Sequence, residues 1–296
     1  MHHDSRLSSV NPSEESTVLF TDEHDIEAAS KVFALEGYCV FSNLLSAEVV
    51  NNLLEGVDEA IAAGKLVIRD DKMNTNDDAI FANPAIEAVC KHPTIIAVAR
   101  AFIGRAVTLQ HAKFNAKPKS ENVLESEVAW HQDFPFFPHS NSDLVACVIH
   151  LDDEDEGSGS MSFVPGSHLL GEQPHTDEQG NFIYRCREPD NRYRPAELLL
   201  AKRGWVSFHH PFTLHSSGIK THNRDRRLMV FQYRAYDAVQ LAGVLWRCNG
   251  YKVDDTEPDV NVARFPDGSR ISLRGRGGRL YDLYGRLKPN SPLKSY

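Results

Sequence analysis

From Val107 onward, the sequence consists of short β-prone runs that are separated by turn residues. Many short strands with frequent turns are typical of a sandwich or barrel. No internal repeat and no domain boundary is visible, and all-β folds of this size often form one domain. We therefore expect a single domain over residues 19–296, after a polar, Ser-rich arm at 1–18 that should be frayed. The expected strands are Val107 to Asn115, Val128 to Asp133, Leu144 to Leu151, Met161 to Val164, Trp205 to Phe208 and Leu228 to Tyr236.

The part before Val107 has helical spacing instead. Apolar residues recur at about every third or fourth position between Asp25 and Glu36, and Gly37 follows as a stop. Ser46 is placed to cap a second helix, and a third is expected over about Pro93 to Phe102. The fold class expected from these patterns is mainly β with flanking helices.

Composition and charge exclude several classes of protein. The formal net charge of -9 argues against nucleic-acid binding, and no apolar run reaches the roughly 18 residues of a membrane span. We expect a soluble, cytoplasmic protein. The charge is uneven, because eight Lys or Arg follow Val262 against two Asp. This basic tail either attracts an anionic substrate, through residues such as Arg274, Arg276 and Arg279, or pairs with the acidic body.

The most informative motif is Trp130-His131-Gln132-Asp133-Phe134. Strand side chains alternate between faces, so His131 and Asp133 should point the same way. With His215 far downstream, they supply the 2-His-1-carboxylate set of non-haem Fe(II) oxygenases. His-X-Asp alone also occurs by chance, and most of the fourteen histidines should be structural or exposed. A zinc hydrolase and a jelly-roll binding protein whose metal site has lapsed remain alternatives. His209 and His210 are left out of the site.

An arginine pair follows the distal histidine. Arg226 and Arg227 begin a β-prone run, and a guanidinium can bind a carboxylate cosubstrate through two hydrogen bonds. Strand alternation lets only one of them point inward, and we assign that role to Arg226. The alternative is that both are exposed, as arginines beside a loop usually are.

Three blocks of sequence resemble the phytanoyl-CoA dioxygenase family of Fe(II)/2-oxoglutarate oxygenases. They are Trp130 to Phe134, Ser142-Asp143-Leu144-Val145-Ala146-Cys147, and Gly159-Ser160-Met161-Ser162-Phe163-Val164-Pro165-Gly166-Ser167-His168. The resemblance also includes the Gly37 to Phe41 strand and the Trp205 to Tyr233 segment, and it covers about residues 20 to 236.

The resemblance implies a double-stranded β-helix, or jelly roll, with iron held by His131, Asp133 and His215. It implies that Arg226 binds the 5-carboxylate of 2-oxoglutarate, with Ser217 helping. Matching the family's Lys-Pro pair to Lys117-Pro118 directs Asn115 and Lys113 toward the cosubstrate and His111 toward the substrate. It also directs Ile149 toward the cosubstrate pocket.

The implied activity is oxidation of a small organic substrate with Fe(II), 2-oxoglutarate and O2, supported in vitro by ascorbate. Halogenating relatives replace the carboxylate of the motif, so Asp133 favours hydroxylation of an unactivated C-H bond. Desaturation, epoxidation and ring formation remain alternatives. A natural-product intermediate is one candidate substrate, and the oligomeric state, monomer or homodimer, stays open.

Three further features bear on the substrate. Phe134 and Phe136 form either an apolar wall near the iron or an ordinary core cluster. The loop over about 171–195 is either a lid or a plain insertion, because long loops in compact domains are often functional. Residues 237–296 lie outside the resemblance, and we expect them to shape specificity.

Overall fold

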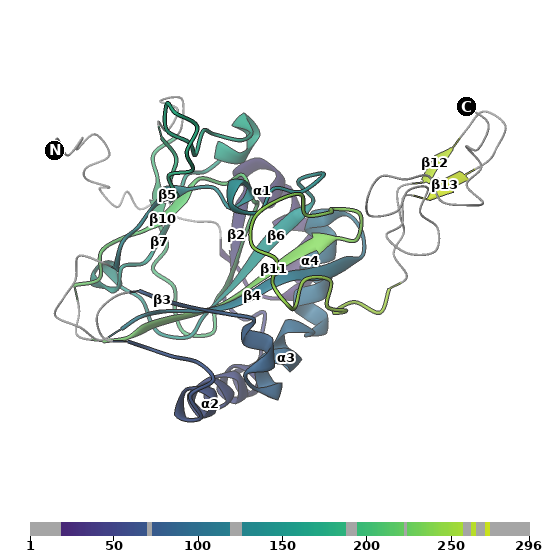
Figure 1. Ribbon diagram of the computed structural model, residues 1–296. Coiled ribbons are helices and arrows are strands. Elements are labelled where there is room, and N and C mark those ends of the chain that lie inside the picture. The colour runs from purple at the N-terminus through teal and green to yellow at the C-terminus, as the bar shows by residue number, and fades with distance from the viewer. Residues whose placement is uncertain are drawn as a thin grey trace.

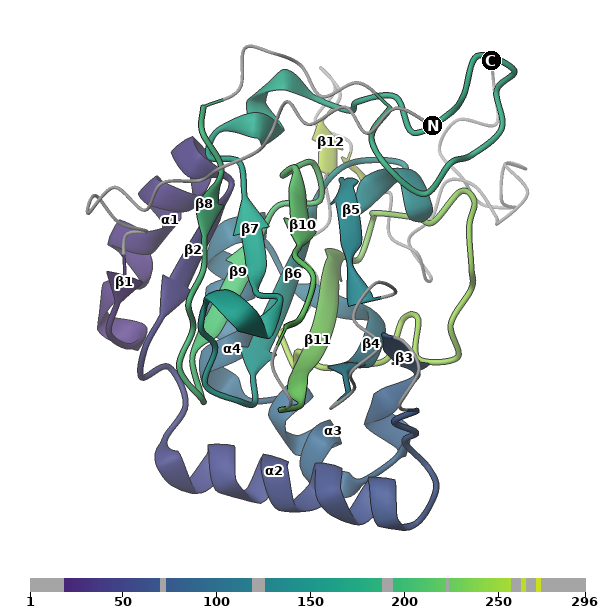
Figure 2. The ribbon, with the colours of Figure 1, turned by 90° about the vertical axis from the view of Figure 1, so that its left-hand side faces the viewer.

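In the computed structural model, the described residues are 19–69, 73–118, 126–187, 194–221, 224–256, 262–264 and 270–272. Two β-sheets face each other in these residues, and helices cover the outer face of the larger sheet (Figures 1 and 2). The sheets do not close into a barrel. The expected mainly-β jelly roll with flanking helices is confirmed.

The strands divide unevenly between the sheets. In spatial order, the larger sheet contains β1 (Leu19–Phe20), β2 (Tyr38–Phe41), β9 (Val206–His209), β6 (Leu144–His150), β11 (Arg226–Ala235), β4 (Val107–Lys117) and β3 (Asn74–Asp77). The smaller sheet contains β5 (Val128–His131), β10 (His215–Ser217), β7 (Met161–Phe163) and β8 (Glu197–Leu198). A separate antiparallel pair joins β12 (Val262–Arg264) to β13 (Arg270–Ser272).

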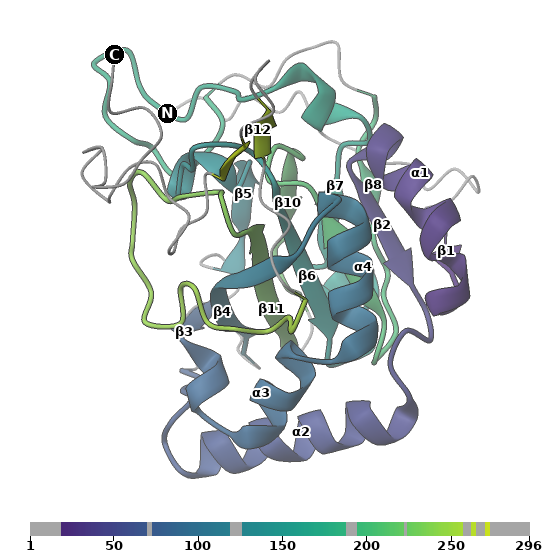
Figure 3. The same cartoon turned by 90° about the vertical axis from the view of Figure 1, so that its right-hand side faces the viewer.

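The four α-helices are α1 (Ile26–Glu36), α2 (Ala47–Ala62), α3 (Pro84–Cys90) and α4 (Pro93–Ile103). Figure 3 shows α1 and α4 side by side on the outer face of the larger sheet, with α2 and α3 at one end. The expected stops and caps are present. Gly37 ends α1 with φ +79°, and the Ser46 hydroxyl accepts a hydrogen bond from the Val49 amide at 3.3 Å.

Alternation along the central strands separates two cores. On β6 and β11, residues such as Ile149 and Phe231 pack toward the helices in the main core, whereas Val148 and Leu228 pack between the two sheets. Both faces of these strands are therefore buried. This explains why they read as continuous apolar runs in the sequence.

One expected strand is shorter than predicted, which changes the account of the motif. Strand β5 ends at His131, and Asp133 has helical dihedrals, φ -70° and ψ -40°, as the N-cap of a short 3-10 helix over Phe134–Phe136. Strand alternation is therefore the wrong reason for His131 and Asp133 to share a direction. The turn after β5 brings the carboxylate back beside the imidazole.

Two other observations bear on the sequence predictions. No α-helix in the described ranges is both long and apolar enough to span a bilayer. The arm at 1–18 and the arginines Arg274, Arg276 and Arg279 lie outside the described residues, so nothing here tests what was expected of them.

Candidate active site

Two neighbouring strands of the smaller sheet position His131 and His215. Strands β5 and β10 are antiparallel, and their register sets His131 directly opposite His215. The Nδ1 atom of each ring donates to the carbonyl two residues earlier, Ala129 or Thr213, at 2.9 Å. This contact leaves both Nε2 atoms facing the space between the sheets, because it fixes the tautomer and the ring orientation.

Asp133 completes a convergent set of donor atoms. Its Oδ1 lies 4.0 Å from Nε2 of His131 and 3.8 Å from Nε2 of His215. One ligand atom from each residue falls within 4.8 Å of the other two. These separations suit one metal ion bound by three groups on one side, which leaves positions open on the other.

His209, which the sequence analysis left out, belongs to this site. It ends strand β9 of the larger sheet, and its Nε2 donates to Oδ2 of Asp133 at 3.1 Å. The carboxylate therefore keeps Oδ1 toward the two histidines. On β9, Phe208 packs toward the helices in the main core, so its neighbours at 207 and 209 face the opposite side of the strand. This alternation could have shown from the sequence that His209 faces the space between the sheets.

The protonation states fit a metal site. Burial lowers the pKa of His131 and of His215, so both imidazoles are neutral near pH 7. Burial alone would raise the pKa of Asp133, but the hydrogen bond from His209 and the nearby histidines hold it well below its usual value. Two neutral imidazoles and one carboxylate are the forms that bind divalent iron.

A cavity of about 190 Å³ lies between the sheets and contains these groups. Of the side chains expected to bind cosubstrate or substrate, five line it: Arg226, Ser217, Asn115, Lys113 and His111. His215 starts β10 of the smaller sheet and Arg226 starts β11 of the larger one. They therefore face the cavity from opposite sheets.

Three other expected residues do not line the cavity. Ile149 points to the helix side of β6, and its neighbour Val148 takes the inward position. Phe134 is part of the main core, and its ring is tilted against that of Phe212 with centroids 4.7 Å apart. Phe136 packs edge-on to the ring of His131, with centroids 5.4 Å apart, but does not reach the cavity. The choice between a core cluster and an apolar wall is thus settled for Phe134 in favour of the core.

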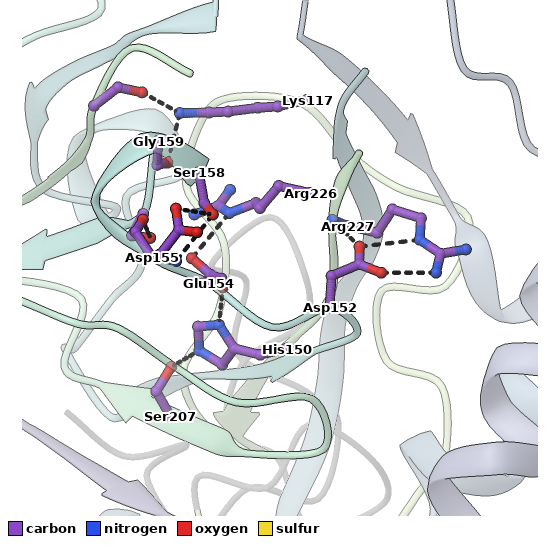
Figure 4. Close-up of polar contacts among 12 residues, drawn as sticks. Lys117, His150, Asp152, Glu154, Asp155, Ser158, Gly159, Ser207, Arg226 and Arg227 are labelled. Atoms are coloured by element: carbon purple, nitrogen blue, oxygen red, sulfur yellow. Dashed lines mark hydrogen bonds and ion pairs between the residues drawn. The ribbon is translucent and has the colours of Figure 1, made fainter. Parts of the chain in front are cut away.

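Arg226 is held in the cavity wall by a buried polar chain (Figure 4). Its Nε donates to Oε2 of Glu154 at 3.3 Å. The other oxygen of Glu154 accepts from His150, whose Nε2 accepts from Ser207 at 3.0 Å. Nη2 of Arg226 is buried and has no hydrogen-bond partner among the described residues. An unpaired buried guanidinium nitrogen at a cavity wall fits a bound carboxylate.

The adjacent Arg227 points the other way, as alternation requires. It binds Asp152 through two nitrogens, at 3.1 and 2.8 Å (Figure 4). It also pairs with Asp58 at 2.9 Å. Lys117, opposite Arg226 in the β4 register, is also buried, and its Nζ donates to the carbonyls of Gly159 and Gly218. Burial and the charge of Arg226 lower the pKa of Lys117 to about 6.

The loop after β7 is attached to the motif by Gln132. The buried amide of Gln132 donates to the carbonyl of Gly171 at 2.9 Å and accepts from the Gln173 amide at 2.7 Å. Its backbone N-H donates to Nε2 of His175 at 3.0 Å. Phe182 then packs edge-on to Phe136, with centroids 5.0 Å apart. The described part of the loop therefore lies beside the metal ligands.

Comparison with known proteins identifies the family of the chain. Residues 33–228 match the family described as phytanoyl-CoA dioxygenase (PhyH). A "probable alpha-ketoglutarate-dependent hypophosphite dioxygenase" of Stutzerimonas stutzeri is 32% identical over 235 residues, which cover 73% of this chain and 79% of that protein.

Solved structures show the same fold at lower identity. The carbocyclase SnoK from nogalamycin biosynthesis has a TM-score of 0.64 at 23% identity, covering 74% of this chain and 87% of SnoK. EctD from S. alaskensis, solved with 2-oxoglutarate and 5-hydroxyectoine, has a TM-score of 0.60 at 18% identity, covering 76% and 84%.

Proposed function

The chain belongs to the phytanoyl-CoA dioxygenase family of iron- and 2-oxoglutarate-dependent oxygenases, and we propose that it hydroxylates an unactivated C-H bond of a small organic substrate. One observation carries the proposal. The donor atoms of His131, Asp133 and His215 converge at a cavity that Arg226 also lines, and Nη2 of Arg226 has no hydrogen-bond partner among the described residues. A metal site and a carboxylate site in one cavity are what this chemistry requires.

The chain's residues have separate parts in the proposed reaction. Arg226 binds the 5-carboxylate of 2-oxoglutarate, and Glu154 keeps its guanidinium aimed into the cavity. Ser217 on the smaller sheet and Asn115 on the larger sheet line the same cavity and support the cosubstrate from its two sides. When bound, iron and 2-oxoglutarate together reduce O2, so that one oxygen atom enters the substrate's C-H bond and the other leaves in succinate as CO2 is released.

Apolar side chains complete the enclosure. Val128, Met161, Leu228 and Val230 line the cavity beside the polar groups. They exclude water from beside the metal ligands, which strengthens the electrostatic interactions of the groups bound there. His209 holds Asp133 in one orientation, so the open side of the metal faces the cavity.

Hypophosphite is a second candidate substrate. It is the substrate named for the relative that is 32% identical, and it is small enough to bind beside 2-oxoglutarate in this cavity. The oxygen atom would then enter a P-H bond in place of a C-H bond, converting hypophosphite to phosphite. The remaining products, succinate and CO2, would be the same.

The test is succinate formation from 2-oxoglutarate with Fe(II), ascorbate and air, with and without hypophosphite and a panel of small carboxylic acids and natural-product intermediates. We expect substrate-dependent succinate and one oxidised product per succinate. Zn(II) in place of Fe(II) should give none. Purified protein that binds neither iron nor 2-oxoglutarate would contradict the proposal.

A further inference from the structure

One cavity side chain has hydrogen-bonding capacity that the protein does not use. Gln232 on β11 is fully buried and lines the cavity, yet neither its Oε1 nor its Nε2 has a hydrogen-bond partner in the described chain. Leaving a buried amide unpaired is costly, and such groups in native proteins usually meet water or a ligand. Gln232 therefore marks a position where a polar ligand is expected.

The strand register places Gln232 beyond the reach of the cosubstrate. Arg226 pairs with Lys117 at one end of β11, and Gln232 pairs with His111 six residues further on. At about 3.3 Å per residue, their Cα atoms are about 20 Å apart. An extended five-carbon acid spans only about 5 Å between its end carbons, since a C-C bond is about 1.5 Å long. A 2-oxoglutarate anchored on Arg226 thus ends short of Gln232.

The metal ligands lie between these two ends. Lys113, which is opposite Val230 in the register, is close enough for its charge to act on both His131 and Asp133. The three ligands, Lys113, Gln232 and His111 all line one cavity, and Gln232 and His111 lie at the end of β11 and β4 away from Arg226. This end lacks the carboxylate anchor of the cosubstrate and is where a substrate can bind.

Lys113 gives this part of the cavity a positive charge. Its Nζ lies 4.7 Å from the ring centroid of Trp246, and it forms no salt bridge within the described ranges. Trp246 itself is buried against the ring of His111, with centroids 4.5 Å apart. An aromatic face stabilises an ammonium group. The carboxylates of Asp77, opposite Lys113 in the register of β3 and β4, and of Asp133 act on the same charge, so Lys113 presents a cation that an anion in the cavity can also contact.

We propose that Gln232 and Lys113 recognise the primary substrate, and that this substrate is a small oxyanion, either a carboxylate or a phosphorus oxyanion. Nε2 of Gln232 donates to an oxygen of the anion, Oε1 accepts from a protonated group on the substrate, and Lys113 compensates the charge. This inference rests on the proposed function and adds the substrate class to it. It assigns Lys113 to substrate binding, in place of the cosubstrate binding that the family resemblance implied.

The experiment measures binding in the absence of oxygen, so that no turnover occurs. Calorimetry first records 2-oxoglutarate binding to the Fe(II)-loaded protein, and then titrates acetate, methylphosphonate or neutral acetamide into that complex. We expect acetate or methylphosphonate to bind at least ten-fold more tightly than acetamide. Whichever of the two anions binds more tightly shows whether the substrate's anionic group is a carboxylate or a phosphorus oxyanion. Failure of 2-oxoglutarate to bind would instead count against the proposed function.

Two variants separate recognition from folding. Gln232→Met keeps the side-chain length, and we expect about ten-fold weaker oxyanion binding with unchanged 2-oxoglutarate affinity and no loss of thermal stability. Lys113→Met should weaken oxyanion binding by a similar factor and leave the affinity for acetamide unchanged. Gln179→Met and Lys65→Met, at exposed positions, serve as matched controls.

Three results would overturn the proposal. The first is acetamide binding as tightly as both oxyanions. The second is Lys113→Met weakening 2-oxoglutarate binding while oxyanion binding stays unchanged. The third is Gln232→Met retaining full oxyanion affinity.

Discussion

The orientation of two imidazoles decides whether the site can hold a metal. His131 and His215 each donate Nδ1-H to the carbonyl two residues earlier, so both rings are fixed before any ion arrives. Loss of an outer-shell partner alone typically costs 10- to 100-fold in metal affinity, and loss of a ligand costs more. We therefore predict that His131→Ala lowers Fe(II) affinity by more than about 100-fold, as measured by anaerobic titration and metal analysis. His24→Ala, at an exposed histidine, should retain the metal.

Arg226 and Arg227 provide a matched pair of variants, because adjacent strand residues face opposite sides. Arg226→Met removes the cavity guanidinium, and hydrogen bonds to charged groups contribute about 1.5–3 kcal/mol. We predict that half-saturation by 2-oxoglutarate rises roughly 10- to 100-fold while Fe(II) affinity is retained. Arg226→Lys should not restore it, since an ammonium lacks the planar fork.

Arg227→Met is the control, because it loses only contacts to Asp152 and Asp58 on the far side of the strand. Equal loss of iron in Arg226→Met and His131→Ala would contradict the separate roles of the two residues.

At the scale of elements, the buried pair of Glu154 with Arg226 links the turn after β6 to the start of β11. Burial would raise the pKa of Glu154, but Arg226 and His150 lower it to about 2. Because the pKa of Glu154 is lower in the folded than in the unfolded state, ionised Glu154 stabilises the fold above about pH 4.5. This stabilisation is lost as the pH falls toward 2. The shift corresponds to about 3 kcal/mol.

We predict that Glu154→Gln lowers the free energy of unfolding at pH 7 by about 3 kcal/mol, because it leaves Arg226 buried without its counterion. The difference between wild type and variant should shrink as the pH falls from 4.5 to 2. Urea unfolding across that range measures it. Glu156→Gln, at an exposed position, should follow the wild type. A difference that does not depend on pH would rule out this linkage.

The loop after β7 depends on a single residue of the motif. Gln132 bonds the backbone of Gly171 and Gln173, and it also bonds the carbonyl of Phe212 at 2.7 Å. We predict that Gln132→Leu increases amide hydrogen exchange over residues 171–187, with exchange in β4 and β11 unchanged. Lower 2-oxoglutarate consumption without substrate in this variant would argue against the loop acting as a lid.

The elements also show where sequence reasoning succeeds. The caps at Ser46 and Gly37 were predictable because local hydrogen bonding and a positive φ decide them. The three-residue strand β10 was not, since its pairing with β5 and β7 is decided by contacts distant in sequence. His131, Asp133 and His215 were found by residue type and family spacing. His209 was missed because its alternation with Phe208 shows which face it shares but not that this face meets the metal ligands of the other sheet.

At the scale of the whole molecule, the two faces of the larger sheet have different tasks. One face packs on the helices, and the other faces the smaller sheet and supplies Arg226, Lys113 and Gln232 to the cavity. Alternation predicts that a strand has two faces but does not say which is functional, so Ile149 was chosen over Val148. Choosing correctly requires knowledge of which face the helices cover.

The segment after β11 closes one side of the molecule. Arg234 donates to the carbonyl of Ala238 at 3.0 Å and to Asn249, and Trp246 packs against His111 and Phe137. This segment lies beyond residues 33–228, which match the family, and it contacts the cavity wall through His111.

Trp246 is buried, and replacement of a buried Trp by Ala usually costs about 3–5 kcal/mol. We predict that Trp246→Ala lowers the free energy of unfolding by that amount in urea titration, while Fe(II) and 2-oxoglutarate still bind because Arg226 and the three ligands lie on other elements. Leu245→Ala is the control, since Leu245 is 76% exposed. If Trp246→Ala and Leu245→Ala unfold at the same urea concentration, the segment is not part of the core. Its part in closing the substrate end would then have to be abandoned.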